Sequence, residues 1–231
     1  LNDDRQTAYL VRDEPGTKGT AQMTTTATVA TPLLMPTTTR LGPIHLAVTD
    51  ADRALSIWRD VVGLTLLSRT DKEIVLGAGD APLVVLYPDA KAPVTPNTLG
   101  LYHVAIHVPT RRDLARALNR AAHARVRVSP TDHLVSEALY LWDLDGNGIE
   151  ITYETPWRGR FVENDELMAI TADGQRHSGR EPIDIEGLIA ELDGDNDPLG
   201  PMPKGTRIGH VHVHVDDLDA AMGFYRDQIG F

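Results

Sequence analysis

The sequence contains no cysteine. This absence excludes disulfide bridges, thiolate zinc sites, iron–sulfur clusters and thiol nucleophiles together. Aromatic residues make up only 5% of the 231 residues. No uninterrupted apolar run approaches the ~20 residues that a membrane-spanning helix needs. We therefore expect a protein that does not enter a membrane.

Basic residues are also scarce, because 22 Lys and Arg stand against 33 Asp and Glu, a formal net charge of −11. A nucleic-acid-binding protein needs a basic face to meet phosphates, so we expect no nucleic-acid partner. The N-terminus lacks a charged segment followed by an apolar core, so no secretion signal is predicted. We expect a soluble, cytoplasmic protein that acts on a small molecule, and a homo-oligomer is compatible with this composition.

The chain divides into five segments by pattern. Threonines crowd the first forty residues without helical or strand periodicity, so that stretch is predicted to be flexible. The segments are a flexible N-terminus (1–40), a first module (41–97), a second module (98–155), a polar linker with one short helix at 185–192 (156–205), and the start of a third module (206–231).

Both complete modules follow the order strand, helix, three strands. Alternating apolar residues predict the strands, and apolar residues at helical spacing from Leu55 to Val62 and from Leu114 to Ala122 predict the helices. The predicted strands are 44–48, 64–68, 73–76 and 83–87 in the first module, and 101–108, 125–128, 138–142 and 148–153 in the second. The fold class is therefore α+β, built from repeated βαβββ modules.

A third copy begins near the end of the sequence. When residues 44–64 are set over residues 211–231 without a gap, eight of 21 positions are identical, against about one expected by chance. This copy stops after its predicted helix, and a strand and a helix alone cannot bury their apolar faces. We therefore expect the complete protein to carry four such modules.

The repeat places His45, His103 and His212 at corresponding positions on the first strands of the three modules. Glu150, flanked by two isoleucines, lies on the last predicted strand of the second module, with its side chain on the opposite face from theirs. A buried carboxylate needs a partner, because burying a bare charge is costly. Two imidazoles and one carboxylate form the ligand set of non-haem Fe(II) oxygenases, which leaves positions open for substrate and O2.

These features resemble the vicinal oxygen chelate superfamily, which includes glyoxalase I, extradiol dioxygenases and antibiotic-resistance proteins. The resemblance rests on the βαβββ repeat, the first-strand histidines and the run from Tyr140 to Glu150, and it covers residues 41–155 and 206–231. It implies a glyoxalase/extradiol dioxygenase fold, in which modules pair into open curved sheets or half-barrels. The branch that the chain resembles most is that of catechol 2,3-dioxygenase.

The resemblance also implies roles for individual residues. His103 and Glu150 are implied as metal ligands, His133 as a general acid/base, and Tyr140, ten residues before Glu150, as a hydrogen-bond donor to a substrate oxygen. The metal implied is Fe(II), with Mn(II), Zn(II) and Ni(II) as alternatives. The implied substrates are O2 and a small aromatic diol, whose ring opens beside the diol.

The third ligand depends on which modules pair. Pairing of the first two modules makes it His45, whereas pairing of the second and third makes it His212, which we favour because that strand is rich in histidine. His210 and His214 project from the same strand face as His212 and are expected, with His107, to line the substrate pocket.

Two other functions remain open on the same scaffold. A glyoxalase-type metal-dependent isomerase or lyase would use a second Glu on the last strand of the partner module. The strand at 83–87 carries no carboxylate, which disfavours such a site between the first two modules. A metal-free protein that binds a small molecule such as an antibiotic is the third hypothesis, but it gives Glu150 no task.

Overall fold

The computed structural model describes residues 34–162 and 168–231, and the chain separates into two compact units. The larger unit spans residues 41–214, and the smaller one comprises, of the described residues, 34–40 and 215–231. Most of the N-terminal segment that we expected to be flexible, residues 1–33, lies outside the described residues. No helix among the described residues has the length and apolar character to cross a membrane.

The first module forms a four-stranded sheet in the order β1-β4-β3-β2. β1 runs parallel to β4, and the other neighbours are antiparallel. The helix begins at Asp50, whose carboxylate accepts a hydrogen bond from the backbone N–H of Arg53. Its elements are β1 (Ile44–Ala47), α1 (Ala51–Trp58), β2 (Thr65–Arg69), β3 (Ile74–Ala78) and β4 (Ala81–Tyr87).

The second module repeats this topology in the order β5-β8-β7-β6. A capping box starts its helix, because Thr110 and Asp113 each accept a hydrogen bond from the other's backbone N–H. Its elements are β5 (Gly100–His107), α2 (Arg111–His123), β6 (Ser129–Asp132), β7 (Ser136–Trp142) and β8 (Gly148–Glu154). The α+β class and the repeated βαβββ order are confirmed, and both sheets are open.

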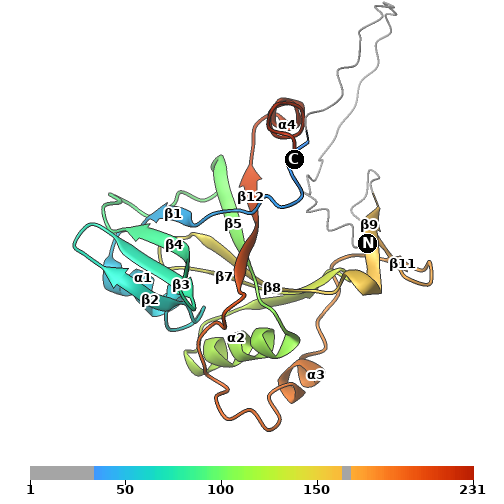
Figure 1. Ribbon diagram of the computed structural model, residues 1–231, viewed down its shortest axis with the longest axis horizontal. Helices are drawn as coiled ribbons and strands as arrows, with labels where there is room; N and C mark the ends of the chain where they lie inside the picture. Colours follow the sequence, from blue (N-terminus) through green and yellow to red (C-terminus); the bar gives the residue numbers. More distant parts are fainter. Residues whose placement is uncertain (1–33, 163–167) are drawn as a thin grey trace, which may run out of the picture. The chain divides into compact units, whose positions relative to one another are not determined.

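The strand of the third module, β12 (Arg207–His214), extends the second sheet by pairing antiparallel with β5 (Figure 1). The resulting sheet has the order β12-β5-β8-β7-β6. Its register shifts between Ile208 and His210, where Gly209 is an extra residue on β12. Such a bulge lets Arg207 and His210 face the same side although they are three residues apart.

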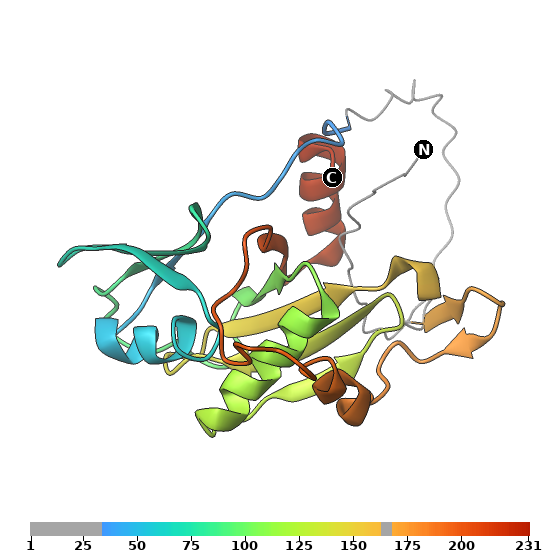
Figure 2. The ribbon, with the colours of Figure 1, turned by 60° about the horizontal axis from the view of Figure 1, so that its bottom comes forward.

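One hydrophobic core joins the two modules. It includes Trp58, Ile106 and Ile149, all fully buried, and α2 lies along one face of the five-stranded sheet, against β7 and β8 (Figure 2). The Trp58 indole N–H donates to Asp143 across 3.0 Å, which ties α1 to the turn between β7 and β8. The opposite sheet face is thereby left for polar side chains.

The segment that we expected to be a linker is more structured than predicted. The predicted helix is present as α3 (Ile185–Ala190), but a small antiparallel sheet of β9 (Gly159–Val162), β10 (Met168–Thr171) and β11 (Arg176–His177) was not expected. The strand predicted at 125–128 is wrong. Arg125 takes a left-handed turn with φ 57°, and β6 starts only at Ser129.

The smaller unit contains the helix that we predicted after the third-module strand. It is α4 (Leu218–Met222), capped by the Asp217 carboxylate, and it continues as a π-helical segment (Gly223–Ile229). Within this unit the backbone N–H of Met35 donates to the carbonyl of Gly230 across 2.8 Å.

Candidate metal centre

One row of neighbouring residues across the five-stranded sheet organises the site. Tyr140 on β7 pairs with Glu150 on β8, Glu150 with Ala105 on β5, and Ala105 with His210 on β12. Paired residues on adjacent strands present their side chains to the same face. Ala105 has only a methyl group, so Glu150 and His210 can meet above it. His103, two residues before Ala105 on β5, projects from the same face.

Three side chains of this face converge on one point. The Nε2 atoms of His103 and His210 each lie 3.0 Å from Glu150 Oε2. The two Nε2 atoms are 3.3 Å apart. Among the described residues, the side chains of His103, Glu150 and His210 lie close enough together to hold one metal ion.

The chemistry of the donors fits a divalent ion. Glu150 Oε2 is buried and has no hydrogen-bond partner among the described residues, although two imidazole nitrogens approach it closely. Ligand atoms that lie about 2.1 Å from a common ion and at right angles to one another are about 3 Å apart. The three observed separations match that value. The residues therefore fit a metal centre with two nitrogen ligands and one oxygen ligand.

The electrostatics of the site keep the carboxylate ionised. Burial alone would raise the pKa of Glu150, but the imidazoles of His103 and His210 hold it well below its ordinary value. His103 and Glu150 are nearly inaccessible, whereas the His210 side chain is 39% exposed. The centre is therefore open on the β12 side, where further ligands can reach it.

The two expected third ligands lie elsewhere. His212 pairs with His103, one row away from Glu150, and on its other side His103 faces Gly148 on β8. The pKa of His212 falls to about 4 because of burial and the neighbouring histidines. His45 lies exposed on β1 of the other sheet, where Nδ1 is 2.9 Å from the hydroxyl of Tyr87. The histidine that the structure places beside Glu150 is His210, which we had expected to line the pocket.

The two residues expected to handle protons contact each other. His133 Nε2 lies 2.9 Å from the Tyr140 hydroxyl, and His133 Nδ1 lies 2.6 Å from the carbonyl oxygen of Gly179. A carbonyl only accepts, so Nδ1 donates to it, and Nε2 is left to accept a hydrogen bond from the Tyr140 hydroxyl. Burial, followed by the charge of Glu150, raises the pKa of Tyr140, which keeps its hydroxyl protonated.

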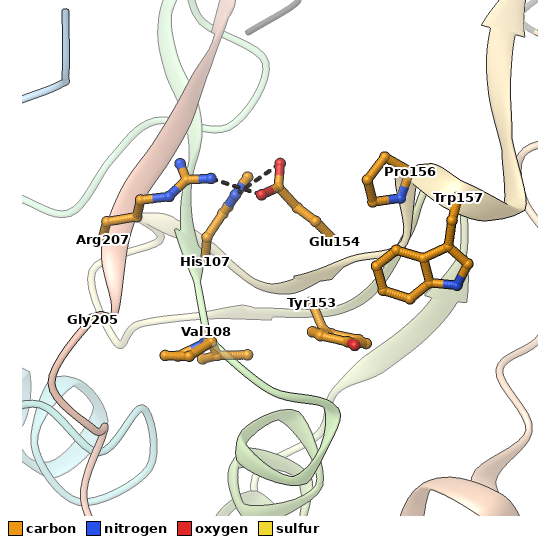
Figure 3. A pocket seen from close by; sticks show the side chains of 9 residues that line it. His107, Val108, Tyr153, Glu154, Pro156, Trp157, Gly205 and Arg207 are labelled. Carbon is orange, nitrogen blue, oxygen red and sulfur yellow. Dashed lines mark hydrogen bonds and ion pairs between the residues drawn. The ribbon is translucent and has the colours of Figure 1, made fainter. Parts of the chain in front are cut away.

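The other two residues expected to line the pocket, His107 and His214, lie near opposite ends of β12. The ring of His214 stacks on Tyr102, with 4.5 Å between centroids. The ring of His107 lies 5.8 Å from that of His210 and borders a cavity of about 330 Å³ at the ends of β5 and β8 (Figure 3). Arg207, Glu154 and Trp157, which also line this cavity, were not identified from the sequence.

One sequence signal for this arrangement was available. A glycine inside a strand pattern often marks a bulge, and Gly209 precedes the three alternating histidines. The bulge does not change which of these histidines share a face, but it aligns Arg207 with them. A Cβ at Gly209 would lie about 2.0 Å from the His107 ring, so a larger residue at this position would displace that ring.

Known proteins are similar to this chain in sequence. Residues 40–151 match the Glyoxalase/Bleomycin resistance protein/Dioxygenase superfamily. A Catechol-2,3-dioxygenase of Bacillus subtilis (strain 168) is 39% identical over 199 residues, which cover 84% of this chain and 65% of the relative. The chain thus spans less than two thirds of the length of that relative.

Two further relatives are more distant. The Glutathione transferase FosA of Serratia marcescens is 26% identical over 137 residues, which cover 54% of this chain and 96% of that protein. The crystal structure of a glyoxalase/dioxygenase from Nostoc punctiforme superimposes with a TM-score of 0.45 at 21% identity, covering 55% of this chain and 99% of the other. Residues 40–151 are therefore a domain of the Glyoxalase/Bleomycin resistance protein/Dioxygenase superfamily.

Proposed function

We propose that the protein is an Fe(II)-dependent extradiol dioxygenase that opens the ring of catechol or a related aromatic diol. The observation that carries the proposal is the convergence of His103, Glu150 and His210 within 3.3 Å of one another, on a face that is open at His210. Two imidazoles and one carboxylate on one side of an ion leave positions for further ligands. The 39% identity to a Catechol-2,3-dioxygenase supports this chemistry.

His103, Glu150 and His210 would hold the metal. When bound, Fe(II) supplies a redox-active centre that can take up the diol and O2 together. The single carboxylate offsets only part of the charge of a divalent ion, which favours a substrate that binds as an anion. The ligand set therefore suits a catechol that gives up a hydroxyl proton on binding.

In this proposal His133, with Tyr140 beside it, receives and returns that proton. The carbonyl of Gly179 accepts from His133 Nδ1, so Nε2, which lies beside the Tyr140 hydroxyl, is the nitrogen that can take up a proton. Tyr140 lies between this nitrogen and Glu150, with its hydroxyl kept protonated. In the proposed roles Tyr140 donates a hydrogen bond to a substrate oxygen, and His133 acts as acid and base in the ring opening that incorporates both oxygen atoms.

Ring cleavage by the full-length protein tests the proposal. After anaerobic loading with Fe(II) and addition of catechol, admission of air should produce the yellow ring-opened product with one O2 consumed per catechol. The His210→Ala variant should lose this activity, and the His45→Ala variant should retain it, because His45 lies on the other sheet. Absence of O2 uptake with any diol, together with turnover of a hemithioacetal under Ni(II) or Zn(II), would instead establish a glyoxalase-type isomerase.

A further inference from the structure

Buried polar atoms without partners gather on one face of the five-stranded sheet. Among the described residues, six buried side-chain nitrogen and oxygen atoms lack a hydrogen-bond partner. They belong to His103 and His107 on β5, Glu150 and Thr152 on β8, and Arg207 on β12. Leaving a buried polar group unpaired costs about 1 to 3 kcal/mol. A set of such groups on one face therefore indicates a missing ligand.

The proposed metal accounts for only part of this set. His107, Thr152 and Arg207 form their own row, because His107 pairs with Arg207 on one side and with Thr152 on the other. This row lies beside the row of Ala105 and Glu150. Alternate positions along a strand are about 7 Å apart, so the second row is within reach of a substituent on a ring held at the metal centre.

A cavity opens at this second row. His107, Glu154 and Arg207 line it on one side, and Pro156 and Trp157 stand on the other (Figure 3). The Trp157 side chain is 64% exposed, so the cavity is accessible from solvent. Its wall thus combines apolar rings with polar groups, of which His107 Nε2 and Arg207 Nη1 have no hydrogen-bond partner among the described residues.

The two charged residues that line the cavity, Arg207 and Glu154, form an ion pair. Arg207 Nη2 pairs with Glu154 Oε2 at 2.7 Å, and His107 Nδ1 lies 3.3 Å from the other oxygen of Glu154. The nearby His107 lowers the pKa of Glu154, which is therefore ionised. An anionic ligand group would lie against this carboxylate, whereas a hydroxyl could bond to His107 and to the unpartnered Nη1 of Arg207.

We propose that the cavity lined by His107, Glu154 and Arg207 is a second subsite, which binds an uncharged hydroxyl-bearing arm on the ring of the diol. This inference rests on the proposed function, because it takes the diol to be held at the neighbouring metal centre. The preferred substrates are then catechols with a neutral polar substituent, ahead of unsubstituted, alkylated or carboxylated ones.

Three ring-substituted diols test the subsite by binding alone. Their dissociation constants are measured by calorimetry on the full-length, Zn(II)-loaded protein, so that no turnover is needed. The probes are 4-methylcatechol, 4-(hydroxymethyl)catechol and 3,4-dihydroxybenzoate, which differ only in their arm. We expect the hydroxymethyl compound to bind roughly five- to tenfold more tightly than the methyl compound, and the carboxylate no more tightly than the methyl compound.

Two variants test whether the preference for the hydroxymethyl compound depends on the nitrogens of His107. His107→Phe keeps a ring over Gly209 without its nitrogens and should bring the ratio of the two dissociation constants to about one. His45→Phe, on the other sheet, should leave it unchanged. Circular dichroism verifies that each variant is folded.

The outcomes separate this proposal from the dioxygenase assignment. Equal binding of the methyl and hydroxymethyl compounds, a preference that survives His107→Phe, or tightest binding of the carboxylate would overturn the subsite. If the preference holds but no diol is cleaved by the Fe(II)-loaded protein, the subsite stands and the dioxygenase proposal fails. If catechol is cleaved and the preference is absent, only the subsite fails.

Discussion

His210 Nε2 lies 3.0 Å from Glu150 Oε2, although the two residues belong to strands that are not neighbours in the sheet. β5 runs between them, and it contributes the small side chain of Ala105 at the level of both. The contact therefore depends on an alanine that itself binds nothing. His103, from the same strand, completes the group from one side.

Metal retention should distinguish His210 from His212. The His210→Ala variant is expected to lose metal affinity by at least about a hundredfold, because it removes one of three ligands. The His212→Ala variant should lose no more than a few-fold, because His212 lies in the row of His103 and not beside Glu150. Metal content after dialysis, measured by atomic emission, checks both. Equal losses in the two variants would contradict the ligand set.

Removal of the acid/base pair should slow the reaction without releasing the metal. The His133→Ala and Tyr140→Phe variants are expected to lower kcat by roughly 10²- to 10⁴-fold, since proton transfer by a positioned side chain contributes about that much. Neither residue belongs to the group of His103, Glu150 and His210, so iron content should stay at the wild-type level. The test compares kcat per bound iron of each variant with that of the wild-type protein. A variant that retains both iron and full kcat would remove that residue from the mechanism.

Acid should weaken the ion pair between Arg116 on α2 and Asp195, which follows α3. Arg116 donates two hydrogen bonds to the Asp195 carboxylate, from Nε at 2.7 Å and from Nη2 at 2.9 Å. The guanidinium lowers the pKa of that carboxyl to about 2. A carboxyl whose pKa is lower in the folded state contributes stability above its unfolded pKa near 4, and this contribution is lost as the pH falls toward 2. Urea unfolding between pH 4 and pH 2 should therefore show a shallower decline for Asp195→Asn than for wild type. Asp193→Asn, at an exposed neighbouring position, serves as the control.

The turn between β7 and β8 should be a stability determinant with no part in metal binding. Asp143 is buried and accepts hydrogen bonds from the Trp58 indole, from two backbone N–H groups and from the Asn147 side chain. Asp143→Ala leaves these donors unpaired and is expected to cost about 2 to 4 kcal/mol of unfolding free energy. Chemical denaturation measures the loss. A change below 0.5 kcal/mol, of the size usual for surface substitutions, would contradict this role.

The sequence by itself determined the modules and the residue types of the site. Alternation in short windows predicts strands, helical spacing predicts the helices between them, and both patterns are local properties of the chain. The same alternation placed Glu150 on the opposite strand face from its flanking isoleucines, and those isoleucines are buried. These features follow from backbone geometry, which repeats every two residues in a strand and every 3.6 in a helix.

Only the tertiary structure decided which histidine meets Glu150. His210 and His212 share one face of β12, so no local pattern separates them. Their difference lies in the pairing of β12 with β5, which puts His210 at the level of Ala105 and His212 at the level of His103. Register between strands about a hundred residues apart is set by packing and by bulges across the whole sheet. A shift of two residues keeps every side chain on its face and changes the ligand.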